Sequence, residues 1–81
     1  MSVESIHVEG RLYVSLEVVA ELYEVKSVLL REAYDCGLLG TGVDHERTLC
    51  IAAVQLERVA TIVQLHQTLG LGLEAITERL G

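Results

Sequence analysis

The chain has 81 residues, of which 51% are hydrophobic and none is Trp, Phe or Pro. A chain of this length has room for one modest core, because it buries only about 60% of the surface that its unfolded form exposes; we therefore expect residues 1–81 to form a single domain. Six basic and twelve acidic residues give a net charge of −6. This balance disfavours nucleic acid as a partner, since contacts to phosphates supply most of the affinity of DNA-binding proteins.

No apolar run approaches the roughly 18 residues needed to cross a bilayer, and no basic segment followed by a hydrophobic one opens the chain. The sequence therefore predicts a cytoplasmic protein with no membrane partner. The cysteines and histidines lack metal-ligand spacing, and no Gly-rich phosphate loop or nucleophile beside a histidine is visible. We expect no metal, no cofactor and no catalysis, and we expect Cys36 and Cys50 to be buried as small hydrophobes.

Residues 1–14 alternate between apolar and polar side chains, which is the period of an extended strand. The apolar positions are Ile6, Val8, Leu12 and Val14. Glu9 and Gly10 stand between them as turn residues. The segment fits a small hairpin or one strand leading into the first helix, and His7 is expected to face solvent.

Residues 15–39 predict two short helices back to back. The first has apolar residues at helical spacing, namely Leu16, Val19, Ala20 and Tyr23. Ser15 is its expected N-cap, and Ser27 is the expected cap of the second helix, whose apolar face carries Leu30, Ala33 and Tyr34. Gly37 is expected to end that helix in a left-handed conformation, with Leu38 packing back. Two helices joined by about three residues form a helix-turn-helix.

The second half predicts a wing and two further helices. Gly40–Arg47 forms a polar turn, and Thr48–Ile51 has the character of a short strand. Residues 52–69 predict one long helix that Gly70 and Gly72 end, and Leu73–Leu80 predicts a last short helix, with His66 near the edge of the apolar stripe in a packing role. The expected fold is therefore mainly α: a small winged helix-turn-helix domain with a short β-hairpin or wing and a long C-terminal helix.

The chain resembles two related families. The DNA-binding domain of MerR-type transcription regulators is matched by Val25 at the start of the second helix, Arg31 six residues later, Gly37-Leu38-Leu39 at its end and Leu69–Ile76 before the last helix. The CbpM-type chaperone modulators resemble a MerR domain without its effector half, and the spacing from Val14 to Ile76 fits them without a gap. The resemblance implies the MerR-like fold described above.

The wing separates the two families. Leu49 stands where MerR wings carry a phosphate-binding Arg, and Ile51 stands at their final Tyr; the modulators have an apolar pair there. By this resemblance the protein is a non-enzymatic chaperone modulator that binds the J-domain of a DnaJ- or CbpA-like co-chaperone and regulates its interaction with DnaK. An acidic face would cover the basic helix of the J-domain. The candidate residues of that face are Glu17, Glu21, Glu24, Glu32 and Asp35.

Two alternatives remain open. The first is a MerR-like DNA-binding transcription regulator that places Lys26, Arg31 and Arg47 on phosphates. The second is a dimerisation module whose excess apolar surface pairs with a second copy through the C-terminal helices.

Overall fold

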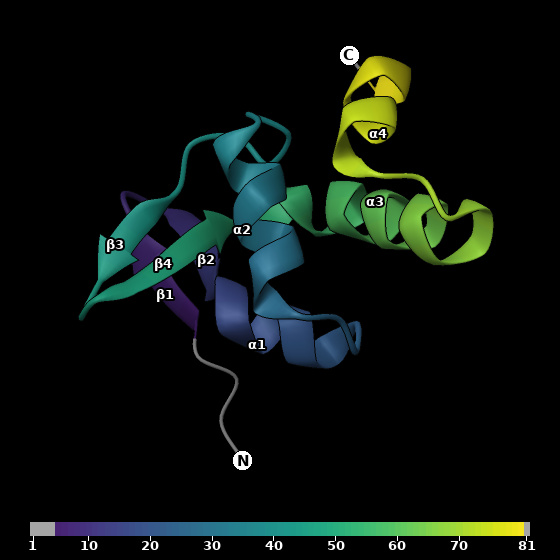
Figure 1. The fold of residues 1–81 in the computed structure, drawn as a ribbon. Helices are drawn as coiled ribbons and strands as arrows, with labels where there is room; N and C mark the ends of the chain where they lie inside the picture. The colour runs from purple at the N-terminus through teal and green to yellow at the C-terminus, as the bar shows by residue number, and fades with distance from the viewer. Residues whose placement is uncertain (1–4, 81) are drawn as a thin grey trace.

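The computed structural model describes residues 5–80 of the chain. The elements in order are β1 (Ser5–Val8), β2 (Arg11–Ser15), α1 (Leu16–Leu22), α2 (Ser27–Asp35), β3 (Val43–His45), β4 (Thr48–Ala52), the 3-10 turn η1 (Ala53–Gln55), α3 (Leu56–Leu69) and α4 (Leu73–Leu80). Figure 1 shows the sheet at one end of the molecule, α1 and α2 in the middle, and α3 and α4 at the other end. Residues 1–4 and 81, which the predicted single domain includes, lie outside the described part.

Four strands form one curled antiparallel sheet with the order β1-β2-β4-β3. Each outer strand is joined to its inner neighbour by a two-residue turn. The first turn, Glu9–Gly10, has φ values of 51° and 79°, and the second, Glu46–Arg47, has 49° and 66°. Positive φ at both positions defines the type I′ turn, whose twist matches that of paired strands. The sequence-based hairpin around Glu9–Gly10 is confirmed for its described residues, and His7 is exposed as expected.

The prediction of a mainly α winged helix-turn-helix is wrong. Helices make up 54% of the structure, and the N-terminal hairpin belongs to the same sheet as the expected wing. Strand β2 pairs with β4, which places Val14 opposite Ile51 and Ser15 opposite Cys50. Ile51 is 0% exposed and Leu49 packs against the core. The expected wing strand is thus an inner strand of a sheet, and its two apolar residues face the protein interior.

The core lies between one face of this sheet and the four helices. Each α-helix contributes at least one side chain with 0% exposure: Val19 from α1, Leu30 from α2, Val59 from α3 and Ile76 from α4. The Tyr23 hydroxyl donates a hydrogen bond to the Leu56 carbonyl (3.3 Å), which ties the end of α1 to the start of α3. The helices expected in residues 15–39 and 73–80 are therefore present, and their apolar stripes form one core with the sheet.

Local signals set the ends of the helices. The Ser15 Oγ accepts from the Val18 amide at 3.5 Å, so the expected N-cap is confirmed. Gly37 has φ +83°, and the Leu38 amide donates to the Ala33 carbonyl at 3.0 Å, as a Schellman motif requires. The predicted cap at Ser27 is wrong, because Lys26 adopts the extended cap conformation and no side chain caps α2.

Three further expectations differ from the structure. The helix predicted for residues 52–69 begins only at Leu56, because Ala52 pairs with Tyr13 in the sheet and a 3-10 turn follows it. Cys50 is buried as expected, but Cys36 is exposed. His66 does not pack in the core: it is exposed, and its Nδ1 lies 2.9 Å from the Leu71 carbonyl.

Candidate functional site

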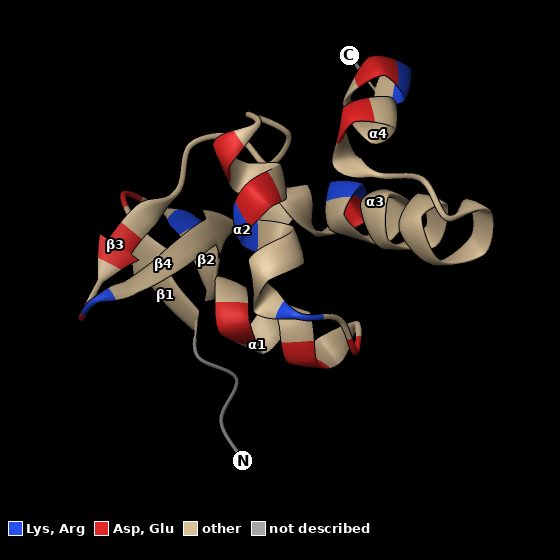
Figure 2. Ribbon diagram, viewed as in Figure 1, with Lys and Arg blue, Asp and Glu red and all other residues tan. Residues whose placement is uncertain are grey.

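The charged side chains of residues 5–80 all lie on the surface. The one ion pair found among them joins His45 Nε2 to a Glu46 carboxylate oxygen at 3.9 Å. Figure 2 shows acidic positions on α1, α2 and α4, with basic positions between them. Because these charges are not consumed in ion pairs within the described part, they are available to a ligand or partner.

Carboxylates from α2 and α4 surround a groove of about 640 Å³, which we call the acidic groove. Its lining residues are Glu32, Asp35, Cys36, Leu73, Glu74, Thr77 and Glu78. Glu32 and Asp35 are spaced i, i+3 on α2, and Glu74 and Glu78 are spaced i, i+4 on α4, so each pair projects from one side of its helix. The two pairs give the groove an acidic wall on each helix.

The groove residues that lie between the two acidic walls offer few free hydrogen-bonding groups to a ligand. The Thr77 hydroxyl is already engaged, since it donates to the Leu73 carbonyl at 2.7 Å. Leu73 is half-buried and packs against the core, and Ile76 on the adjoining side of α4 is fully buried, which fixes this helix in place. The acidic groove therefore combines apolar contact area with negative charge on both sides.

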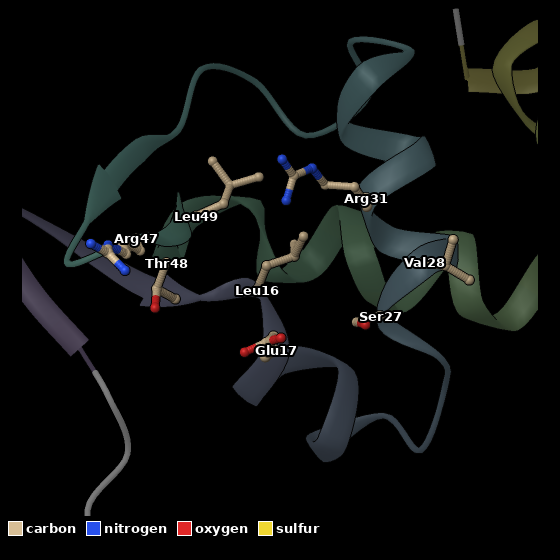
Figure 3. Close-up of a pocket in the computed structure, with 8 residues that line it drawn as sticks. All are labelled: Leu16, Glu17, Ser27, Val28, Arg31, Arg47, Thr48 and Leu49. Atoms are coloured by element: carbon tan, nitrogen blue, oxygen red, sulfur yellow. The ribbon is translucent and has the colours of Figure 1, made fainter.

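A second groove, of about 230 Å³, lies between α1, α2 and the turn that joins β3 to β4. We call it the arginine groove, and Figure 3 shows its lining residues: Leu16, Glu17, Ser27, Val28, Arg31, Arg47, Thr48 and Leu49. Arg31 reaches from α2 toward Leu49, Arg47 and Thr48 come from the β3–β4 hairpin, and Glu17 comes from the first turn of α1. Two guanidinium groups and one carboxylate thus share one small hollow.

The five carboxylates proposed from the sequence do not gather at one place. Glu32 and Asp35 lie in the acidic groove, whereas Glu17 lines the arginine groove. Glu17 and Glu21 also line a shallow depression on α1. Glu24 lines another depression, together with Glu32 and Lys26.

The sequence reading missed Glu74 and Glu78, which complete the acidic groove. Their signal was available, because residues spaced i, i+4 on the predicted last helix lie on the same side of it. What the sequence could not supply was the position of that helix beside α2.

Of the three basic residues in the DNA-binding alternative, only Arg31 and Arg47 line the same groove. Lys26 lines a different depression, together with Glu24, Glu32 and His66. The three cations therefore do not form one positive patch, and Glu17 lines the same groove as Arg31 and Arg47.

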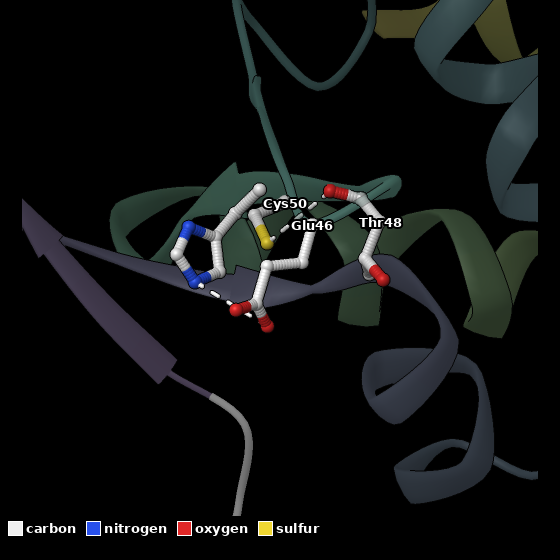
Figure 4. Close-up of polar contacts among 4 residues, drawn as sticks. Glu46, Thr48 and Cys50 are labelled. Carbon is white, nitrogen blue, oxygen red and sulfur yellow. Dashed lines mark hydrogen bonds and ion pairs between the residues drawn. The ribbon is translucent and has the colours of Figure 1, made fainter.

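The polar contacts of the β3–β4 hairpin are local (Figure 4). His45 pairs with Glu46, the next residue in the chain, and the Cys50 Sγ lies 3.7 Å from the Thr48 carbonyl oxygen. Nowhere in residues 5–80 do three His, Cys, Asp or Glu side chains gather in a way that could hold a metal ion. None of the helices in the same range has the length and apolar character needed to cross a membrane.

Comparisons with protein-family models, curated proteins and solved structures give no match to this chain. The resemblance to MerR-type and CbpM-type proteins thus draws no support from them.

Proposed function

We propose that the protein is a non-enzymatic binding module that takes a cationic amphipathic helix of a partner protein in its acidic groove. One observation supports this proposal most directly: carboxylates from α2 and α4 flank an apolar strip in a single groove of about 640 Å³. A helix laid into a groove places its apolar stripe on the floor, and Lys or Arg residues beside that stripe then meet the carboxylates.

Charge complementarity favours this kind of partner. The net charge of −6 repels anionic partners and attracts cationic ones, and complementary potentials raise the rate of encounter and select against wrong partners. Leu73 and Cys36 supply contact area for the apolar stripe, so binding would not depend on charge alone.

The first partner to test is the J-domain of a DnaJ- or CbpA-like co-chaperone, whose basic helix has the required chemistry. Binding there would hide the surface that the J-domain presents to DnaK, so the protein would regulate that interaction by competition. This assignment rests on the sequence resemblance and on charge, and it requires no catalysis, metal or cofactor.

The experiment is a fluorescence-anisotropy titration of a labelled J-domain, and separately of a labelled basic amphipathic peptide, with the full chain. We expect binding that weakens as salt is added. The double variant Glu32→Gln/Glu78→Gln should weaken binding about tenfold or more, because it removes one carboxylate from each wall. Glu57→Gln is the matched control, since Glu57 is an exposed carboxylate that lines a different depression on α3.

Absence of binding by both the J-domain and the peptide would refute the proposal. Binding by the peptide alone would retain the cationic-helix site and reject the J-domain as its partner. If the groove variant loses no more than about twice the binding free energy that the Glu57 control loses, as two removed charges against one would give, then only the overall charge matters and the groove is not the site.

A further inference from the structure

We propose that the arginine groove is a separate binding site for a small zwitterion, namely a free α-amino acid with an aliphatic side chain. The site does not depend on the acidic groove, because the two grooves share no lining residue.

The carboxylate of the ligand is matched by the Arg31 guanidinium, and Arg47 adds a second positive charge at the outer end of the groove, on the β3–β4 turn. Arg31 and Arg47 come from α2 and from the β3–β4 turn, and both line the same hollow (Figure 3). Within residues 5–80 neither arginine forms an ion pair, so the N–H donors of each guanidinium are available to a ligand. A guanidinium binds a carboxylate through two parallel hydrogen bonds.

The ammonium group of the ligand is matched by Glu17. This carboxylate lines the groove from the first turn of α1, across from the β3–β4 turn. Two cations and one anion leave the groove with a local charge near +1. Glu17 also disfavours a phosphate dianion, because it repels the second negative charge.

The aliphatic side chain of the ligand is matched by three apolar residues. Leu16 and Leu49 form the inner part of the groove, and Val28 stands at its edge with 57% of its surface exposed. A ligand side chain that covers Val28 removes apolar surface from water, which favours binding. The Ser27 and Thr48 hydroxyls in the same lining can donate to the ligand carboxylate.

The size of the groove and the net charge of the protein further restrict which ligands are suitable. The groove of about 230 Å³ is smaller than the sites of drug-sized molecules, which begin near 300 Å³. A single amino acid is small enough for a groove of this size. A zwitterion also carries no net charge, so the overall charge of −6 does not repel it.

The test is a two-dimensional ¹H–¹⁵N NMR titration of the full chain with L-leucine as the probe. We expect saturable shifts of the Glu17, Arg31 and Thr48 amides. N-acetyl-leucine lacks the ammonium group and leucinamide lacks the carboxylate, so each should bind at least about fivefold more weakly, in line with the loss of a charge-assisted hydrogen bond. Inorganic phosphate and a short DNA duplex are the competing probes.

Three variants examine the assignment of roles. Arg31→Gln and Arg47→Gln should weaken leucine binding without changing the response to leucinamide, and Glu17→Gln should abolish the preference for leucine over N-acetyl-leucine. Arg58→Gln is the matched control, since Arg58 is an exposed arginine of α3 that lines another depression. The spectrum of each variant outside the groove shows whether it is folded. Val28→Ala leaves the charges intact and should weaken leucine binding slightly, because it removes apolar contact area at the edge of the groove.

The proposal is overturned if leucine causes no saturable shift, or if leucinamide binds as well as leucine. It is equally overturned if phosphate or duplex DNA binds the groove more tightly than leucine, because the groove would then be a phosphate site. None of these results affects the acidic groove, whose test uses a different ligand and different variants.

Discussion

The first residue of the turn between β1 and β2, Glu9, has an unfavourable backbone conformation. Glu9 has φ +51°, a left-handed conformation that costs an L-residue other than Gly or Asn about 1–2 kcal/mol. Asn tolerates this conformation, and Asn-Gly is the preferred pair of a type I′ turn. We expect Glu9→Asn to raise the free energy of unfolding by about 0.5–1 kcal/mol, as measured by urea denaturation. Glu9→Ala should give no gain, because Ala has no preference for positive φ; an equal gain from both would contradict the backbone explanation.

Gly42, at the entrance to β3, is required for a different reason. A Cβ at this position would collide with the Cys50 carbonyl oxygen and press on the Tyr34 ring at 3.2 Å. The backbone oxygen belongs to the inner strand β4 and cannot move away without disturbing the sheet. Gly42→Ala should therefore lower the free energy of unfolding by about 1–3 kcal/mol. Gly72→Ala is the control, because a Cβ there meets no atom within 4 Å; equal losses for the two variants would refute the clash.

At the scale of elements, the features that depend on neighbouring residues could be predicted from the sequence. The cap at Ser15, the left-handed Gly37 and the turn at Glu9–Gly10 are set by the conformational preferences of a few adjacent residues. The pairing of Val14 with Ile51 joins residues far apart in the chain, and no local pattern contains it. Without that pairing, β4 was interpreted as a wing and Ala52 as the start of a helix.

The candidate grooves were only partly predictable for the same reason. Composition and helix spacing identified Glu32 and Asp35, because both stand on a helix that was correctly located. Glu74 and Glu78 become relevant only when α4 lies beside α2, which is a matter of tertiary packing. Likewise, Arg31 and Arg47 were expected to act with Lys26, yet Lys26 precedes the first turn of α2 and faces another depression.

The position of α4 depends on one fully buried side chain. Ile76 is 0% exposed and is the one fully buried residue of this helix in the described part of the chain. We expect Ile76→Ala to lower the free energy of unfolding by about 2–5 kcal/mol, through lost burial and a residual cavity. Amide hydrogen exchange should increase first in residues 73–80, and affinity for the basic peptide should fall because one acidic wall moves.

Leu69→Ala is the control for this experiment, since Leu69 is 54% exposed at the end of α3 and surface truncations change stability by only about 0.5 kcal/mol or less. Faster exchange spread evenly over the whole molecule would contradict a local role for Ile76. It would show instead that α4 unfolds only together with the core.

At the scale of the whole molecule, the net charge is −6, but the two grooves differ in sign. The acidic groove has carboxylates on both walls, whereas the arginine groove has two cations beside one anion. The two sites should therefore respond differently to salt, because screening acts on the net charge of a ligand. A basic helix carries several positive charges, and a zwitterion carries none.

We expect affinity for the basic peptide to fall on the order of tenfold when ionic strength rises from about 0.01 to 0.15 M, as the Debye length shortens from about 30 to 8 Å. Affinity for leucine should change less than about twofold over the same range, since the opposing charges of a zwitterion are screened together. Glu32→Gln/Glu78→Gln should flatten the salt dependence of peptide binding and leave leucine binding unchanged. Parallel salt dependences for the two ligands would mean that the overall charge of −6, and not the arrangement of charges within each groove, controls both interactions.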